Sequence, residues 1–152
     1  MPVTDGGPPR PGEDLLPAGW VYYRDPSGFH VGVPATWMFS SIDSMRCFRD
    51  TTNAKAIAVY PNGNLKGHPT DLLAQGEAAW RQAAGLSDYD QVSIKDLRFD
   101  EGGADLEYTY TREGLALHGV NRMMRLDGKL FTVCWLTEDL YWPTDRYLRD
   151  IM

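Results

Sequence analysis

Hydrophobic and polar positions alternate with a period of two over most of the chain, which is typical of β-strands that bury one face. The alternation begins with Trp20 to Tyr23 and Phe29 to Val33, on either side of the sequence RDPSG. Pro26 pre-sets φ for a turn and Gly28 tolerates a positive φ, so these segments are predicted to pair as a hairpin. MFSSI and MRCFRD are predicted to form a second hairpin, and KAIAVY a further strand that ends at PNGN.

One segment, Pro69 to Ala84, has the period of a helix instead. Its predicted apolar side consists of Leu72, Leu73, Gly76, Ala79, Trp80 and Ala83. Thr70 or Asp71 is predicted to cap the start of the helix, and Gly85 to end it. A glycine in a helix interior costs about 1 kcal/mol relative to alanine, so Gly76 predicts close packing against a flat surface.

The second half of the chain is predicted to form an antiparallel meander of strands near 91–98, 104–111, 115–126 and 129–137. Glycine-containing turns, DEGG, REG and LDG, separate these strands. LFTVCWL is apolar on both faces, which is typical of a central strand. The last segment, YWPTDRYLRDIM, is predicted to be a helix that covers the second face. The predicted fold is therefore α+β, an antiparallel sheet of about six or more strands sandwiched between helices.

The first 19 residues differ from the rest in composition. Five prolines and four glycines deny this segment both strand hydrogen bonds and apolar burial. Residues 1–19 are therefore predicted to be a flexible tether, and residues 20–152 a single folded domain.

Composition excludes several classes of partner. The 152 residues, 43% of them hydrophobic, suffice for one domain with its own core. The formal net charge of -6 argues against nucleic acid as a partner, because phosphate binding needs clustered lysine and arginine. No stretch approaches the ~20 apolar residues that span a bilayer. The sequence predicts a soluble chain, with membrane attachment only through a longer parent polypeptide.

The residues that bind metals and cofactors do not form recognisable motifs. Cys47 and Cys134 are far apart and belong to no CxxC pair, which argues against zinc and leaves their pairing as a disulfide open. Cys134, within LFTVCWL, is predicted to be buried. The three histidines have no metal-ligand spacing, and neither GxGxxG nor GxxxxGK[ST] occurs. No metal and no cofactor are predicted.

A binding site is predicted from loops and aromatic residues, because no catalytic motif such as GxSxG is present. The Gly-rich sequence PNGNLKGHP is predicted to be a surface turn, or alternatively a loop at the rim of a ligand site. Aromatic side chains at the edge of a cleft would bind a small apolar or peptide ligand. The candidate binding residues are Tyr60, Asn62, Asn64, His68, Tyr141 and Trp142.

Several quoted stretches resemble a known family: GWVYYRDPSGFHVGVPATW, then CFRD, the Trp80 helix, YTYT, LHGVNR and FTVCWLTED. They are similar to the domain at the extracytoplasmic end of many actinobacterial serine/threonine protein kinases, of the PsbP/Mog-like α/β/α sandwich class. The resemblance implies a fold and no catalytic residues, and the kinase motifs HRD and DFG are absent. It also implies an extracytoplasmic location if the chain is part of a kinase or a secreted relative; a chain complete as given would be cytoplasmic.

Three functional hypotheses follow. The first is a non-enzymatic sensor or interaction domain for an unknown protein or small ligand. The second is a small hydrolase or isomerase with His68 or His118 as its base. The third is a small-molecule or lipid carrier with a cavity between the sheet and the helix Pro69–Ala84.

Overall fold

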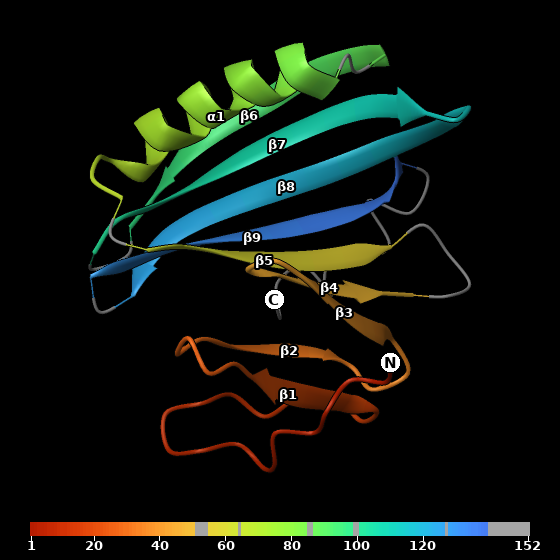
Figure 1. Ribbon diagram of the computed structural model, residues 1–152, viewed down its shortest axis with the longest axis vertical. Helices are drawn as coiled ribbons and strands as arrows, with labels where there is room; N and C mark the ends of the chain where they lie inside the picture. Colours follow the sequence, from red (N-terminus) through yellow and green to blue (C-terminus); the bar gives the residue numbers. More distant parts are fainter. Residues whose placement is uncertain (51–54, 64, 85–86, 99–100, 127, 140–152) are drawn as a thin grey trace.

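The computed structural model describes residues 1–50, 55–63, 65–84, 87–98, 101–126 and 128–139 (Figure 1). Its elements in chain order are β1 (Trp20–Arg24), β2 (His30–Pro34), β3 (Met38–Ile42), β4 (Met45–Arg49), β5 (Ala56–Gly63), α1 (Pro69–Ala84), β6 (Ser87–Leu97), β7 (Gly103–Arg112), β8 (Leu115–Leu126) and β9 (Lys129–Glu138). In the part of the chain that is described, no helix has the length and apolar character needed to cross a membrane.

Seven strands form one antiparallel sheet in the order β3-β4-β5-β9-β8-β7-β6. The predicted meander from β6 to β9 is confirmed, because each of these strands pairs with the next in sequence. Strand β9 is central, as the two-sided hydrophobicity of LFTVCWL predicts, since it pairs with both β8 and β5. The sheet therefore joins the two halves of the chain through the β5–β9 pair.

The first hairpin, β1–β2, is confirmed but forms a separate two-stranded sheet. It packs on one face of the large sheet, where its apolar residues meet those of β4, β5 and β9. The residues of this core are Tyr23, Phe29, Val31, Val33, Trp37, Phe48, Ile57, Val59, Phe131 and Trp135. The sequence did not predict this separation, because hairpin alternation is the same whichever sheet the hairpin joins.

Helix α1 packs on the opposite face of the large sheet, over β6, β7 and β8 (Figure 1). Within the described residues, one face of the sheet thus carries a helix and the other carries the hairpin. The predicted helix at 141–152, which would complete a sandwich between helices, lies outside the described residues.

Two predictions about α1 are wrong, although its bounds are confirmed. The N-cap is His68, whose Nδ1 accepts a hydrogen bond from the Thr70 N–H at 3.2 Å and whose carbonyl accepts one from the Leu72 N–H at 3.0 Å. Ala79 is exposed, and Glu77 is buried on the inner side of the helix instead. Gly85, the predicted stop, lies outside the described residues.

Strand β5 is longer than the sequence predicts. It continues through Pro61 and Asn62 to Gly63, with a register shift between Pro61 and Gly63. A bulge accommodates a proline and a glycine with φ of 65° in a paired strand, so PNGN does not end the strand at Tyr60. Asn62 therefore lies on the sheet and not in a loop.

The segment 1–19, predicted to be a flexible tether, runs along the hairpin and the edge strand β3. The Gly6 N–H donates to the Tyr22 carbonyl at 2.7 Å, and Glu13 pairs with Arg24 at 2.8 Å. Hydrogen bonds from the Arg24 guanidinium lower the pKa of Glu13 to about 2. The Leu16 side chain covers Gly32, where a Cβ would lie 2.7 Å from a Leu16 methyl carbon. The flexibility of this segment remains a prediction.

Candidate functional site

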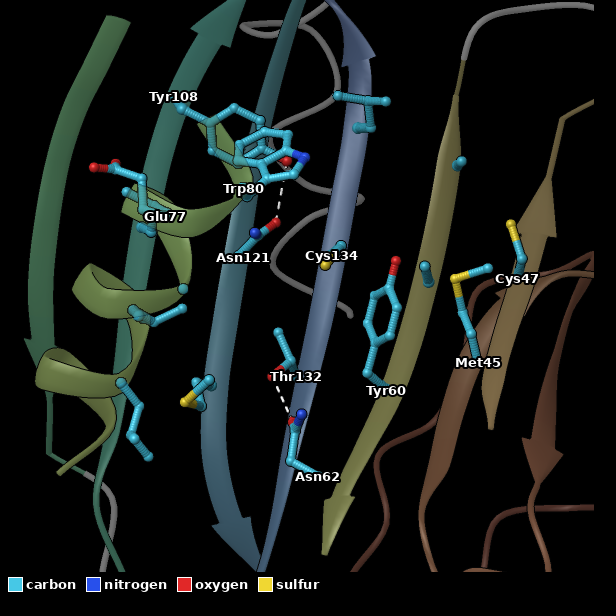
Figure 2. Close-up of a pocket in the computed structure, with 18 of the residues that line it drawn as sticks. Met45, Cys47, Tyr60, Asn62, Glu77, Trp80, Tyr108, Asn121, Thr132 and Cys134 are labelled. Carbon is cyan, nitrogen blue, oxygen red and sulfur yellow. Dashed lines mark hydrogen bonds between the residues drawn. The ribbon is translucent and has the colours of Figure 1, made fainter. Parts of the chain in front are cut away.

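Among the described residues, the face of the sheet that carries α1 is only partly covered. The helix packs over β6–β8, and no other described element packs on the same face of β4, β5 and β9. A groove of about 520 Å³ runs between the helix and this open part of the sheet (Figure 2). Its size lies within the range of roughly 300–1,000 Å³ that is typical of small-molecule sites.

The floor of the groove is made of small side chains that lie beside one another across the strands. Cys47 of β4, Ala58 of β5 and Cys134 of β9 form one row, since both cysteines pair with Ala58. Ala56, which pairs with Arg49 and with Leu136, belongs to the next row. The groove is deep because small residues occupy neighbouring positions on three strands.

Aromatic side chains form the wall beside the helix. The ring of Trp80 meets the ring of Tyr108 edge-to-face at 5.2 Å between centroids, and that of Tyr89 at 5.6 Å. The Tyr108 ring lies directly over Gly119 of the neighbouring strand, where a Cβ would be 2.6 Å from ring atoms. Only glycine at position 119 permits this close approach, so the wall is held in place by backbone contact as well as by ring contacts.

The polar groups of the groove are mostly paired with one another. The Tyr108 hydroxyl donates to the Asn121 side-chain oxygen at 3.1 Å, and the Thr132 hydroxyl donates to that of Asn62 at 2.7 Å (Figure 2). Burial raises the pKa of Tyr108, which therefore stays a neutral donor. Each amide oxygen thus already accepts one hydrogen bond, and each of the two side chains also carries an NH₂ donor group.

Glu77 is the acidic residue of the groove, and its hydrogen-bond donors come from β6. Its carboxylate accepts a hydrogen bond from the Tyr89 hydroxyl at 2.7 Å. The Gln91 amide nitrogen, in the orientation that matches its neighbours, lies 2.9 Å from both carboxylate oxygens. Burial and the hydrogen bond to Glu77 raise the pKa of Tyr89.

The two cysteines line the groove as thiols. Because they lie on strands on either side of β5, their Cα atoms are about 10 Å apart, two strand spacings. A disulfide needs less than about 7 Å, so both cysteines are free. Cys134, predicted to be buried, is partly exposed. Desolvation raises its pKa to about 12, which keeps the sulfur a thiol and a poor nucleophile near neutral pH.

Two of the residues predicted as binding residues lie in the groove. Tyr60 and Asn62, both on β5, line it, and Figure 2 shows the Tyr60 ring pointing into it. His68, at the start of α1, is not among the groove-lining residues. The His68 Nε2 lies 3.5 Å from the carboxylate of Asp96. Asn64, Tyr141 and Trp142 lie outside the described residues.

The sequence did not single out Cys47, Ala58 or Cys134 as groove residues, nor Asn121. All four lie in strands whose alternation predicts ordinary core positions. The one available signal was that small residues, KAIA in β5 and the two cysteines, would share a face once the strand order was known. Strand order is not visible in the alternation pattern.

His118 lies on the opposite face of the sheet and is held between two carboxylates. Its Nε2 is 2.8 Å from Glu107 and its Nδ1 is 2.7 Å from Asp139. Both ring nitrogens therefore lie within hydrogen-bonding distance of a carboxylate, on the face away from the groove. Within the described ranges no three His, Cys, Asp or Glu side chains form a metal-binding group.

The family model described as "Serine/threonine kinase C-terminal domain" matches residues 21–150. The chain belongs to this family. The match begins one residue after the predicted domain start at residue 20 and extends over the described strands and helix from the second residue of β1 to the end of β9. No protein among the curated sequences matches this kinase C-terminal domain.

Solved structures resemble this kinase C-terminal domain in fold. Cyanobacterial PsbP (CyanoP) from Synechocystis sp. PCC 6803 has a TM-score of 0.72 and 18% identity, covering 90% of each chain. The protein PA94 of unknown function from Pseudomonas aeruginosa has a TM-score of 0.56 and 12% identity, covering 88% of this chain and 92% of that one. At these identities the likeness establishes a PsbP-like fold and carries no ligand or partner across.

Proposed function

We propose that this kinase C-terminal domain is the non-catalytic sensor portion of a serine/threonine protein kinase, and that it recognises its ligand in the groove between α1 and the sheet. The family supports the connection to a kinase. In this proposal the domain lies outside the cytoplasm, and only the parent polypeptide connects it to a membrane.

The groove is the observation that carries the proposal. A sheet face that served only stability would be closed by large apolar side chains, as the opposite face is by Phe48, Ile57 and Trp135. On the groove side the corresponding strands carry Cys47, Ala58 and Cys134. A concave, mostly apolar site with a few fixed polar groups is the usual form of a small-molecule site.

The hydrolase hypothesis has less support. The groove thiol of Cys134 is protonated near neutral pH because its pKa is raised to about 12. Both ring nitrogens of His118 contact carboxylates on the other face of the sheet, and His68 caps α1 and is not among the groove-lining residues. Among the described groove residues, no nucleophile therefore meets a base.

Filling the groove from the helix side tests the proposal. A Cβ at Gly76 would meet open space, and Gly76 lines the groove, so a leucine there points into it. Ala78 lies on the exposed side of the same helix and accepts the same leucine outside the groove. Native mass spectrometry of freshly purified protein should detect a small-molecule adduct on the wild type and on Ala78→Leu, and none on Gly76→Leu.

Thermal unfolding of both variants checks that the fold is kept. An adduct that persists on folded Gly76→Leu would place the ligand elsewhere and contradict the proposal. Wild-type protein without any adduct, isolated from its native source, would contradict it as well.

A carrier of small molecules or lipids is the second candidate, because no described element closes the groove on the β4 side, where Arg49 and Met45 lie. A carrier releases its ligand to an acceptor, whereas a sensor retains it while signalling. Transfer of the adduct from the protein to acceptor vesicles within minutes would favour the carrier.

A further inference from the structure

We propose that the groove binds an anionic amphiphile, a medium-chain carboxylate whose apolar body lies over Ala56, Ala58 and Cys134 and whose carboxylate is bound by Arg49. This inference rests on the proposed function of the groove and names the chemical class of its ligand.

The charges of the groove favour an anion. Among the described residues that line it, the charged side chains are Arg49 and Glu77. The Glu77 carboxylate already accepts hydrogen bonds from Tyr89 and Gln91 of β6. Charge complementarity to a ligand therefore depends on the guanidinium of Arg49.

Arg49 retains most of its hydrogen-bonding capacity. Its recorded partner within the described residues is the Cys47 sulfur, which lies 3.4 Å from Nε and is a weak acceptor. Arg49 is exposed at the mouth of the groove. A guanidinium with free N–H groups pairs with a carboxylate through two parallel hydrogen bonds, which is the geometry that arginine favours.

The remaining polar groups also favour a ligand that accepts hydrogen bonds. The side-chain oxygens of Asn121 and Asn62 each already accept a hydrogen bond from a hydroxyl group, whereas no described residue accepts one from their amide NH₂ groups. A ligand rich in donors, such as an amine, would find few acceptors here.

The length of the floor sets the size of the apolar body. Arg49 lies on β4 and Asn121 on β8, and three strand spacings of about 4.8 Å separate these two strands by roughly 14 Å. The wall of Trp80 and Tyr108 ends the groove beyond Asn121. A chain of the length of decanoate fits this span.

Calorimetric titration of the 152-residue chain with decanoate, decanol and decylamine, each below its micellar concentration, tests the inference. Arg49→Gln removes the groove cation, and Arg112→Gln removes an exposed arginine that is not among the groove-lining residues, with the same change in net charge. Arg49→Gln should weaken decanoate binding about tenfold or more and leave decanol binding unchanged. Arg112→Gln should leave both unchanged.

Gly76→Leu serves as the second variant and should abolish decanoate binding. Decanol or decylamine binding as tightly as decanoate, or an unaltered decanoate affinity in Arg49→Gln, would overturn the carboxylate inference while the groove remains a site. Decanoate binding to folded Gly76→Leu would overturn it too, because the ligand would then sit elsewhere. If no probe binds but a native adduct is lost in Gly76→Leu, only this inference fails; if there is no adduct either, the proposed function fails with it.

Discussion

Two buried carboxylates, Asp25 and Glu77, are each held by the hydroxyl of a tyrosine. Tyr23 donates to Asp25 at 2.6 Å and Tyr89 donates to Glu77 at 2.7 Å. Asp25 also accepts a hydrogen bond from Arg46 of β4 at 2.8 Å, which joins the β1–β2 hairpin to the large sheet. A buried charge is tolerated only with such partners, so these contacts fix how the hairpin sits on the sheet.

Asp25→Asn should lower the free energy of unfolding near neutral pH by about 1.5–3 kcal/mol, because hydrogen bonds to a charged group are lost. Burial alone would raise the pKa of Asp25, but hydrogen bonds from Ser27, Tyr23 and Arg46 outweigh it and lower the pKa to about 2. A lowered pKa means that the stabilisation is full above the unfolded value near 3.8 and is lost as the pH falls through about 2.

Urea unfolding of wild type and variant from pH 7 down to pH 2 measures this difference. The gap in stability should shrink in the window between pH 4 and 2. A gap that stays constant with pH would show that shape and not charge carries the contribution of Asp25.

At the scale of elements, two glycines in different settings decide the shape of the groove. Gly119 of β8 lies under the Tyr108 ring, whereas the Cβ position of Gly76 in α1 is open. The sequence predicted close packing at Gly76, and the structure contradicts this. Helical period and propensity identify a glycine within a helix. Whether a neighbouring residue fills the space beside that glycine depends on where the helix lies over the sheet.

Gly119→Ala should lower the free energy of unfolding by about 1–3 kcal/mol, because the Tyr108 ring must move off its position. Gly76→Ala should raise it by about 0.5–1 kcal/mol, because helix propensity improves without a clash. Urea unfolding of the two variants measures both effects. Equal effects of the same sign would mean that the ring does not lie over Gly119.

The strands and α1 could be predicted from the sequence because alternation, turn residues and helical period are local properties. The predictions are wrong where a residue that is distant in sequence determines the local structure. The predicted apolar side of α1 does not include Glu77, because its partners, Tyr89 and Gln91, lie on a strand that the helix pattern does not reveal. Pro61 was expected to end a strand, but pairing with β9 through a bulge retains it in β5.

At the scale of the whole molecule, the groove results from the unequal cover of a seven-stranded sheet. In the part of the chain that the structure describes, one helix lies over β6–β8 and does not reach β4 and β5. Tyr60 and Asn62 could be proposed as binding residues from their aromatic and turn character, but the facing residues Cys134 and Asn121 could not. Their place follows from the β5–β9 and β8–β9 pairs, which join distant parts of the chain.

The N-terminal segment offers a test of how far the folded unit extends. Leu16 packs over Gly32, whereas its neighbour Leu15 is 87% exposed. Leu16→Ala should lower the free energy of unfolding by about 1–2 kcal/mol, and Leu15→Ala should change it by less than about 0.5 kcal/mol. Thermal unfolding compares the two; equal, negligible effects would mean that residues 1–19 behave as a tether.

The aromatic residues also give the molecule two separate optical signals. Trp37 and Trp135 stack with ring centroids 6.0 Å apart beneath the hairpin, an arrangement that couples their electronic transitions and produces circular dichroism in the near ultraviolet. Trp80 stands on the other side of the sheet, at the groove. A ligand that binds in the groove should therefore alter the fluorescence emission of Trp80 and leave the circular dichroism of the stacked pair constant. Unfolding should abolish that circular dichroism. Ligand binding and unfolding can thus be distinguished with unlabelled protein.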